Sequence, residues 1–173
     1  MPQPVLAALA GVLVANGHET EILDCGTLRA VRTLGVPGVR AAGGQMAACG
    51  AVTQGGRWQS WWLDRQIRGL NRVLAESVAA HRAALAAQIV DRPGLDFVVY
   101  QLCTRGEVAE AAAVAALARQ WRPHVAHMVA GPFVDAHAAA LLSARPEFDG
   151  ALVGYVELGI REWAEVAGDR RAW

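Results

Sequence analysis

The sequence predicts an α/β protein, a three-layer sandwich with a mostly parallel sheet. Short Val-rich apolar segments alternate with helical patterns throughout residues 96–165. This alternation is typical of parallel strands that have helices on both faces of the sheet. The chain has 173 residues, 54% of them hydrophobic, which suits one domain of ordinary size with a real core. We therefore expect residues 1–173 to form a single domain.

The N-terminal segment predicts a helix and then a strand. Pro4–Asn16 is apolar on most of its circumference, and Gly17 ends it. His18–Asp24 follows as an expected strand, an order typical of the second half of a βαβ unit. Residues 1–3 leave no room for the strand before it. In a flavodoxin-like (Rossmann-like) order that first strand lies in the middle of the sheet, so we expect a flavodoxin-like sheet whose first strand is missing, or whose place a later segment fills.

The middle of the chain predicts an insertion and a long helix. Residues 27–57 are rich in Gly and are expected to be an irregular insertion, with or without a function. Ser60–Val90 has apolar residues at spacings of three and four, which predicts a helix with Ser60 as its N-cap. Trp58, Trp61 and Trp62 cluster at its start. These tryptophans either cover the end of a core or form a wall for a planar ligand or a partner domain.

The second half predicts three strands, each followed by a helix. Thr104 and Glu107 have the spacing of a capping box, which predicts that a helix begins there and buries Val114, Leu117, Ala118 and Trp121. Pro123 ends that helix. The expected strands are Asp96–Cys103, His124–Ala130 and Asp149–Gly154, and the later helices are Asp135–Ser143 and Val156–Val166.

Parallel sheets of this kind bind ligands at the carboxyl ends of their strands. Three loops follow those ends here, Gln101–Gly106, Ala130–Asp135 and Gly154–Leu158. Gly131 and Gly154 lack bulk, so a large ligand could approach the backbone closely. The helix starts at Thr104 and Glu157 would offer N–H groups to phosphate or amide oxygens. The alternative interpretation is that the small residues only allow helices to pack on the sheet.

Composition excludes several functions. The 16 basic residues balance 16 acidic ones, which argues against a nucleic-acid partner, and no lysine is present for a P-loop or a Schiff base. Three distant cysteines without a Cys-x-x-Cys motif indicate neither a disulfide framework nor a zinc site and suit the reduced cytoplasm. Val5–Val14 is too short to cross a membrane.

Metal-binding and catalytic patterns are weak in this sequence. His124 and His127 are three residues apart on one expected strand and so point to opposite faces. No Gly-x-Gly-x-x-Gly motif follows a strand, so the dinucleotide-binding pattern is absent. Cys103 ends a strand at the loop edge, where a nucleophile could lie, although a small buried thiol is the commoner role. We expect no metal site and no catalytic residue.

The order of these pieces resembles a known domain. Ala130-Gly-Pro-Phe is followed by Pro146-Glu-Phe-Asp and then by Gly154-Tyr-Val-Glu. Together with the first helix, Gly-His-Glu and the Asp-Phe-Val-Val strand, this resembles the cobalamin-binding domain that precedes the catalytic barrel in cobalamin-dependent radical S-adenosylmethionine enzymes. The match covers nearly the whole chain except Thr27–Leu95. The two strongest loops are similar to the Gly-Gly-Pro-His and Gly-Glu-Gly-Glu loops of that family.

The sequence also departs from the family pattern. Ala130 replaces a glycine, Phe133 a histidine, Tyr155 a glutamate and Val156 a glycine, while Gln101 stands where a serine is common. The Asp-x-His-x-x-Gly cobalt-ligand motif is absent, so the resemblance implies cobalamin binding without specifying a histidine ligand. The Cys-x-x-x-Cys-x-x-Cys motif of the barrel is absent as well. The iron–sulfur cluster and S-adenosylmethionine would therefore need a catalytic domain outside this chain.

The resemblance implies a cobalamin-binding module of a radical S-adenosylmethionine methyltransferase-type enzyme, without catalysis by this chain alone. The corrin would lie over the carboxyl ends of the strands, with the catalytic domain as partner and no nucleic acid or membrane. The alternative is a flavodoxin-like interaction domain that has lost its ligand, and a small hydrolase using Cys103 is a third hypothesis. The implied cofactor-binding residues are Gln101, Leu102, Cys103, Thr104, Ala130, Gly131, Pro132, Phe133, Gly154, Tyr155, Val156 and Glu157.

Overall fold

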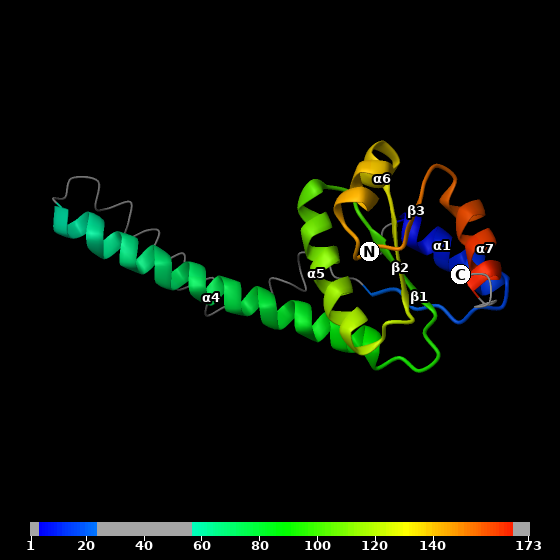
Figure 1. Ribbon diagram of the computed structural model, residues 1–173, viewed down its shortest axis with the longest axis horizontal. Coiled ribbons are helices and arrows are strands. Elements are labelled where there is room, and N and C mark those ends of the chain that lie inside the picture. The colour runs from blue at the N-terminus through cyan, green and yellow to red at the C-terminus, as the bar shows by residue number, and fades with distance from the viewer. Residues whose placement is uncertain (1–3, 24–56, 168–173) are drawn as a thin grey trace. The chain divides into compact units, whose positions relative to one another are not determined.

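A computed structural model of the chain describes residues 4–23 and 57–167. Its contacts divide the chain into two compact units, one formed by Met1–Asp24 with Ala84–Trp173 and the other by Cys25–Ala83. The described elements, labelled in Figure 1, are α1 (Pro4–Ala15), α4 (Arg57–Val90), β1 (Phe97–Gln101), α5 (Arg105–Trp121), β2 (Ala126–Ala130), α6 (Pro132–Ala144), β3 (Gly150–Leu152) and α7 (Val156–Ala167).

The first unit is built on an open parallel sheet. Its strands lie in the order β1-β2-β3, and both neighbouring pairs are parallel. Val99 is opposite Met128, and Ala130 is opposite Leu152. The described part is thus an α/β protein with five helices and a three-stranded parallel sheet, consistent with a flavodoxin-like layout. The predicted fold class is confirmed.

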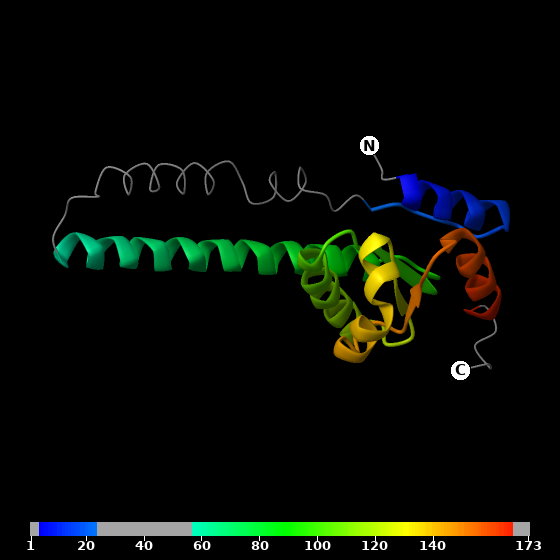
Figure 2. The ribbon, with the colours of Figure 1, turned by 90° about the horizontal axis from the view of Figure 1, so that it is seen from above.

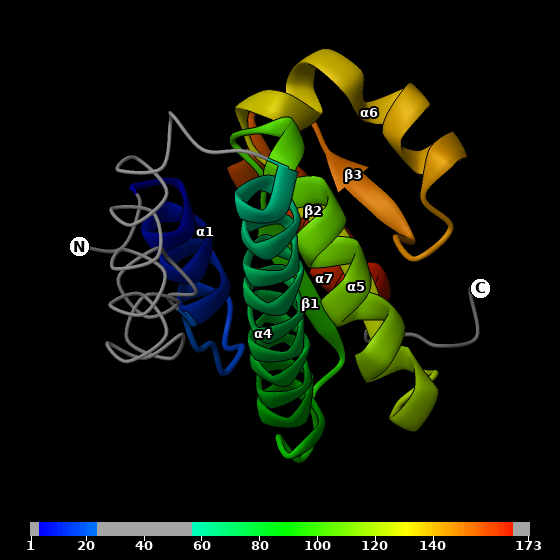
Figure 3. The same cartoon turned by 90° about the vertical axis from the view of Figure 1, so that its left-hand side faces the viewer.

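Helices cover both faces of this sheet because its strands are mostly apolar on both sides. On one face, Val129 packs in a buried cluster with residues of α5 and α6. On the opposite face, Met128 and Ala130 pack against α1 and α7, which lie side by side in Figure 2. Figure 3 shows α6 beside β3, the strand at the end of the sheet order. The three layers of the predicted sandwich are therefore helices, sheet and helices.

The last turns of α4 complete the packing around α5. Leu85, Ala86 and Ile89 form a buried cluster with Val114 and Ala118 of α5. These α4 residues belong to the first unit. The cluster also receives Val98 and Tyr100 from β1. The apolar stripe expected for the long helix is therefore used where its C-terminal end meets α5.

The described part of the second unit is the helix segment 57–83 of α4. Its exposed surface is stabilised locally by ion pairs one turn apart, Asp64 with Arg68 at 2.5 Å and Arg72 with Glu76 at 2.8 Å. Such exposed pairs are screened by solvent and contribute little to stability. The Arg65 guanidinium lies 5.7 Å from the ring centre of Trp61.

The expected strand His18–Asp24 is wrong over the residues that the structure describes. Residues 18–23 have no strand hydrogen bonding. Glu19, Glu21 and Ile22 are exposed, and Glu21 pairs with Arg92 at 2.6 Å. A strand inside a parallel sheet must be apolar on both faces, and the two glutamates prevent this. Asp24 and residues 27–56 of the expected insertion 27–57 lie outside the described residues, and Arg57, the last residue of that expected insertion, is the first residue of α4.

Two helices begin earlier than the sequence pattern predicted. The helix α4 begins at Arg57, so Ser60 lies inside it and is not its N-cap. The helix α6 begins at Pro132, three residues before Asp135. Proline suits the first position of a helix because its φ is already helical and its missing N–H would have no partner there. The strands β1 and β3 are shorter than predicted at both ends, whereas β2 begins two residues late and ends at Ala130 as predicted. Differences of one or two residues are usual for pattern-based boundaries.

Candidate functional site

The candidate site is the carboxyl edge of the sheet, where the three strands end side by side. Every cofactor-binding residue implied by the sequence lies at this edge. Gln101 and Ala130 are the last residues of β1 and β2. The others lie in the loops and helix starts that follow the strands: Leu102, Cys103 and Thr104 after β1, Gly131, Pro132 and Phe133 after β2, and Gly154, Tyr155, Val156 and Glu157 after β3. The parallel order of the strands brings these three groups to one edge.

The loops after β1 and β2 are joined by their backbones. Leu102 donates its N–H to the carbonyl of Ala130 at 2.8 Å, and Phe133 donates to the carbonyl of Leu102 at 3.2 Å. Leu102 and Ala130 are buried. These hydrogen bonds continue the β1–β2 ladder past its end, so the backbones of the two loops are held against each other.

Gly131 is the residue that allows this close approach. Its φ is 113°, a backbone conformation that L side chains rarely adopt. A Cβ atom built on it would lie 2.7 Å from the carbonyl oxygen of Leu102. The lack of bulk at this position is therefore used by the neighbouring loop of the protein itself.

Gly154 has a different environment. Its φ is 74°, and a Cβ on it would meet nothing within 4 Å. Its N–H donates to Oδ1 of Asp135 at 2.9 Å, which fixes the β3 loop to the first turn of α6. Gly154 therefore provides the turn, and the space beside it stays open.

The first turn of α5 is closed by its own glutamate. The Glu107 carboxylate accepts the N–H groups of Cys103 at 2.5 Å and Thr104 at 3.0 Å. This is the glutamate half of the predicted capping box. The N–H groups of Cys103 and Thr104 are therefore not available to a phosphate, because a carboxylate of the protein already binds them.

Exposed apolar side chains surround the loop after β3. Tyr155 is 83% exposed, Leu158 64% and Val153 53%. We call these three residues the apolar patch. The expected site included Tyr155 but not Val153 or Leu158, although strand alternation could have found Val153, which follows the buried Leu152. Three large apolar side chains at one loop mark a surface that can take an apolar ligand or a partner.

The structure holds a second polar cluster, at the amino edge of the sheet, that the sequence did not indicate. His127 is fully buried in β2. Its Nδ1 and the hydroxyl oxygen of Tyr100 lie 2.9 Å apart and share a hydrogen bond. Its backbone N–H donates to Oδ2 of Asp149 at 2.7 Å, and Arg119 donates to the same oxygen at 2.7 Å. Burial and then the charge of Arg119 lower the pKa of His127 to about 4, while Asp149 acts in the opposite direction.

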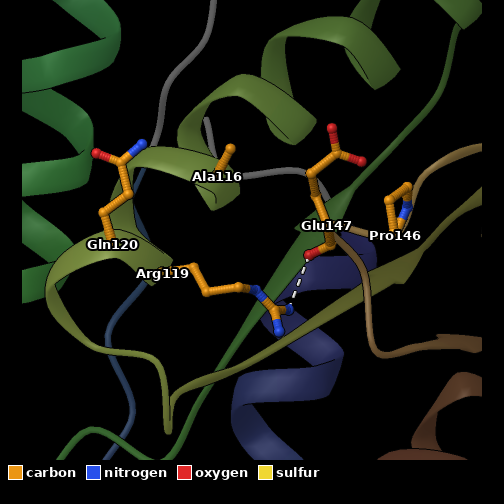
Figure 4. A pocket seen from close by; sticks show the side chains of 5 residues that line it. All are labelled: Ala116, Arg119, Gln120, Pro146 and Glu147. Carbon is orange, nitrogen blue, oxygen red and sulfur yellow. Dashed lines mark hydrogen bonds between the residues drawn. The ribbon is translucent and has the colours of Figure 1, made fainter.

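A shallow surface hollow lies beside this cluster (Figure 4). It encloses about 370 Å³ and is lined by Ala116, Arg119, Gln120, Pro146 and Glu147. Arg119 extends across it and donates to the carbonyl of Glu147 at 3.0 Å. The hollow follows the C-terminal end of α5 and precedes β3, so it lies at the end of the sheet opposite to the predicted site.

Comparisons with known proteins add no relative. No family model, no curated protein and no solved structure matches this chain. Within residues 4–23 and 57–167, no three His, Cys, Asp or Glu side chains are placed to hold a metal ion. No helix in the same part of the chain has the length and apolar character needed to cross a membrane.

Proposed function

We propose that this chain is a cobalamin-binding module of a radical S-adenosylmethionine methyltransferase-type enzyme. The observation that carries the proposal is the apolar patch at the carboxyl edge of a parallel sheet, the edge where proteins of this architecture bind ligands. Cobalamin supplies methyl-transfer chemistry at its cobalt, and the protein supplies binding and orientation.

The residues at this edge fit a large flat ligand better than a small charged one. Tyr155 and Leu158 offer exposed apolar surface, and the space beside Gly154 is open. The loops after β1 and β2 contain no histidine, and neither does the loop after β3. The contribution of this chain would thus be shape and apolar contact from the three loops, with no cobalt ligand from them.

The remaining partners in this proposal lie outside the chain. The iron–sulfur cluster and S-adenosylmethionine would be held by a catalytic domain, because this sequence lacks the Cys-x-x-x-Cys-x-x-Cys motif. That domain would face the same carboxyl edge as the cofactor. We also propose that the protein is cytoplasmic.

A specific observation favours the second candidate, a flavodoxin-like interaction domain without a ligand. The N–H groups of Cys103 and Thr104 bind Glu107, and that of Gly154 binds Asp135. Polar groups that would contact a ligand are thus already satisfied inside the protein. In this case the apolar patch would bind a protein surface.

Gel filtration with hydroxocobalamin tests the first candidate. The folded protein is mixed with excess hydroxocobalamin, and we expect the visible absorbance of the corrin to elute with the protein at about one corrin per chain. Circular dichroism on the same fractions establishes that the protein is folded. A folded protein that elutes without colour contradicts the proposal and favours the interaction domain.

Substitution of the apolar patch shows whether the binding is at the proposed edge. Tyr155→Ala combined with Leu158→Ala should reduce corrin retention at least about tenfold, since each exposed side chain would lose about 1 kcal/mol of contact. Trp121→Ala is the matched control, because Trp121 is 60% exposed at the end of α5, away from the site. The predicted burial of Trp121 is wrong, because the side chain is mostly exposed. Its replacement should therefore leave the core intact, as a control requires. Equal loss in both variants would contradict binding at the carboxyl edge.

A further inference from the structure

The polar cluster at the amino edge fastens three parts of the first unit to each other. Arg119 comes from the last turn of α5, Asp149 immediately precedes β3, and His127 belongs to β2. The carboxylate of Asp149 accepts hydrogen bonds from both Arg119 and the His127 backbone, and its own N–H donates to the His127 carbonyl at 2.8 Å. One carboxylate therefore holds the end of α5 and the start of β3 on the same strand.

The imidazole of His127 is packed where a positive charge has no solvent. It is fully buried, and its ring stacks on Tyr100 with centroids 5.8 Å apart. Its Nε2 is buried without a hydrogen-bond partner, as is Nε of Arg119. A second proton on the ring would place a cation in the core beside a guanidinium, which is costly unless a carboxylate compensates it.

The groups that face this ring come from each neighbouring element. Tyr100 of β1 binds Nδ1, and Arg119 of α5 and Asp149 before β3 act on it through their charges. Glu147, also before β3, accepts a hydrogen bond from Arg119 at its backbone carbonyl and has a buried Oε2 without a hydrogen-bond partner. Asp149 is already shared between Arg119 and the backbone, so it cannot fully neutralise a second cation.

We propose that His127 acts as an acid-sensitive latch, whose protonation releases the end of α5 and the start of β3 from the sheet while the helices on the opposite face stay in place. The charged ring repels Arg119 and competes with it for Asp149. Loss of that ion pair frees the last turn of α5 at its attachment to the segment before β3. The face with α1 and α7 has a separate buried cluster and does not include His127.

The pH range follows from the two states of the histidine. Its pKa is about 4 in the folded protein and about 6.5 in the opened one. The folded-state pKa is lowered, so the latch is fully closed above pH 6.5 and weakens as pH falls toward 4. From pH 8 to pH 5 the opening equilibrium should increase about thirtyfold, because the open form takes up a proton that the closed form excludes.

Hydrogen exchange of the full chain tests the latch. Protection factors, corrected for the intrinsic pH dependence of exchange, are compared at pH 8 and pH 5. We expect about a thirtyfold loss for the end of α5 and for residues 148–152, with a much smaller loss for α1 and α7. An equal loss in all elements indicates general acid unfolding and overturns the proposal, and so does the absence of any loss.

Two variants separate His127 from other acid-sensitive groups. In His127→Gln the acid-dependent loss of protection should disappear, because glutamine keeps polar atoms near Tyr100 and does not titrate. His124→Gln is the matched control, since His124 is exposed just before β2, and it should keep the full loss. If His127→Gln fails to fold, nuclear magnetic resonance of the wild-type His127 ring decides: in the folded protein the ring should titrate near pH 4, while the loss of protection begins near pH 6.5. A folded-state ring that titrates near pH 6.5 overturns the proposal.

Discussion

Gly131 shows that a sequence can identify an important residue and leave its role open. The sequence predicted that the lack of bulk at this position either lets a ligand approach the backbone or only allows helices to pack on the sheet. The structure places the carbonyl of Leu102 there, 2.7 Å from where a Cβ would be. A small residue signals close approach, but the sequence does not say whether the approaching group is a ligand or another loop.

Gly131→Ala should therefore damage the fold itself. The positive φ costs about 1 kcal/mol and displacement of the Leu102 backbone adds more, so we expect a loss of roughly 2–4 kcal/mol in the free energy of unfolding. Urea denaturation measures it. Gly154→Ala is the control: it has a positive φ but open space, and should lose only about 1 kcal/mol. Equal losses would mean that the contact with Leu102 is not restrictive.

A second prediction for a single residue concerns Glu107. Its carboxylate binds two backbone N–H groups before α5, so Glu107→Ala should lower the free energy of unfolding by about 1–2 kcal/mol. Glu162→Ala, at an exposed position of α7, should change it by less than about 0.5 kcal/mol. Thermal unfolding of both variants checks the difference. A result in which both variants unfold like the wild type would exclude a capping role for Glu107.

At the scale of elements, periodicity predicted the helices and strands of the second half because their apolar residues repeat with a clear period. The strand predicted at His18–Asp24 failed because alternating glutamates are compatible with an edge strand but not with a buried parallel one. The amino-edge cluster could not be predicted at all. Arg119, His127 and Asp149 are distant in the sequence, and only the packing of α5 and β3 on β2 brings them together.

The amino-edge cluster predicts that Asp149→Asn and Asp149→Ala lower the free energy of unfolding by different amounts. Asp149→Asn keeps an oxygen for the His127 N–H and loses the charge toward Arg119, a pair that is about one-third exposed. We expect a loss of about 1 kcal/mol or less. Asp149→Ala also leaves the N–H in β2 without its acceptor, so its loss should be about 1–3 kcal/mol greater. Denaturation in urea at neutral pH measures both. Identical values would show that the backbone hydrogen bond contributes nothing measurable.

At the scale of the whole molecule, the predicted three-layer architecture is confirmed and the position of the site follows from it. Parallel strands end at one edge, so residues after β1, β2 and β3 were expected together and are found together. The sequence could not predict how the backbone polar groups at that edge are hydrogen-bonded. Backbone hydrogen bonds close the loops after β1 and β2, and the carboxylates of Glu107 and Asp135 bind the N–H groups there. The surface that remains for a ligand is the apolar patch.

If cobalamin binds this surface, it should stabilise the whole fold. A ligand that binds only the folded chain adds RT ln(1 + [L]/Kd) to the free energy of unfolding, about 2.7 kcal/mol at a hundred times Kd. We expect hydroxocobalamin to raise Tm by several degrees, in proportion to the logarithm of its concentration.

The variant pair used for retention gives this measurement its control. Tyr155→Ala with Leu158→Ala should unfold near the wild-type Tm without cobalamin, because both side chains are mostly exposed, but should gain much less on addition of the ligand. Trp121→Ala should gain as much as the wild type. If cobalamin leaves Tm unchanged in all three proteins, the carboxyl edge does not bind a corrin. The apolar patch is then best explained as a protein-binding surface, because its side chains are exposed on an otherwise well-packed sheet edge.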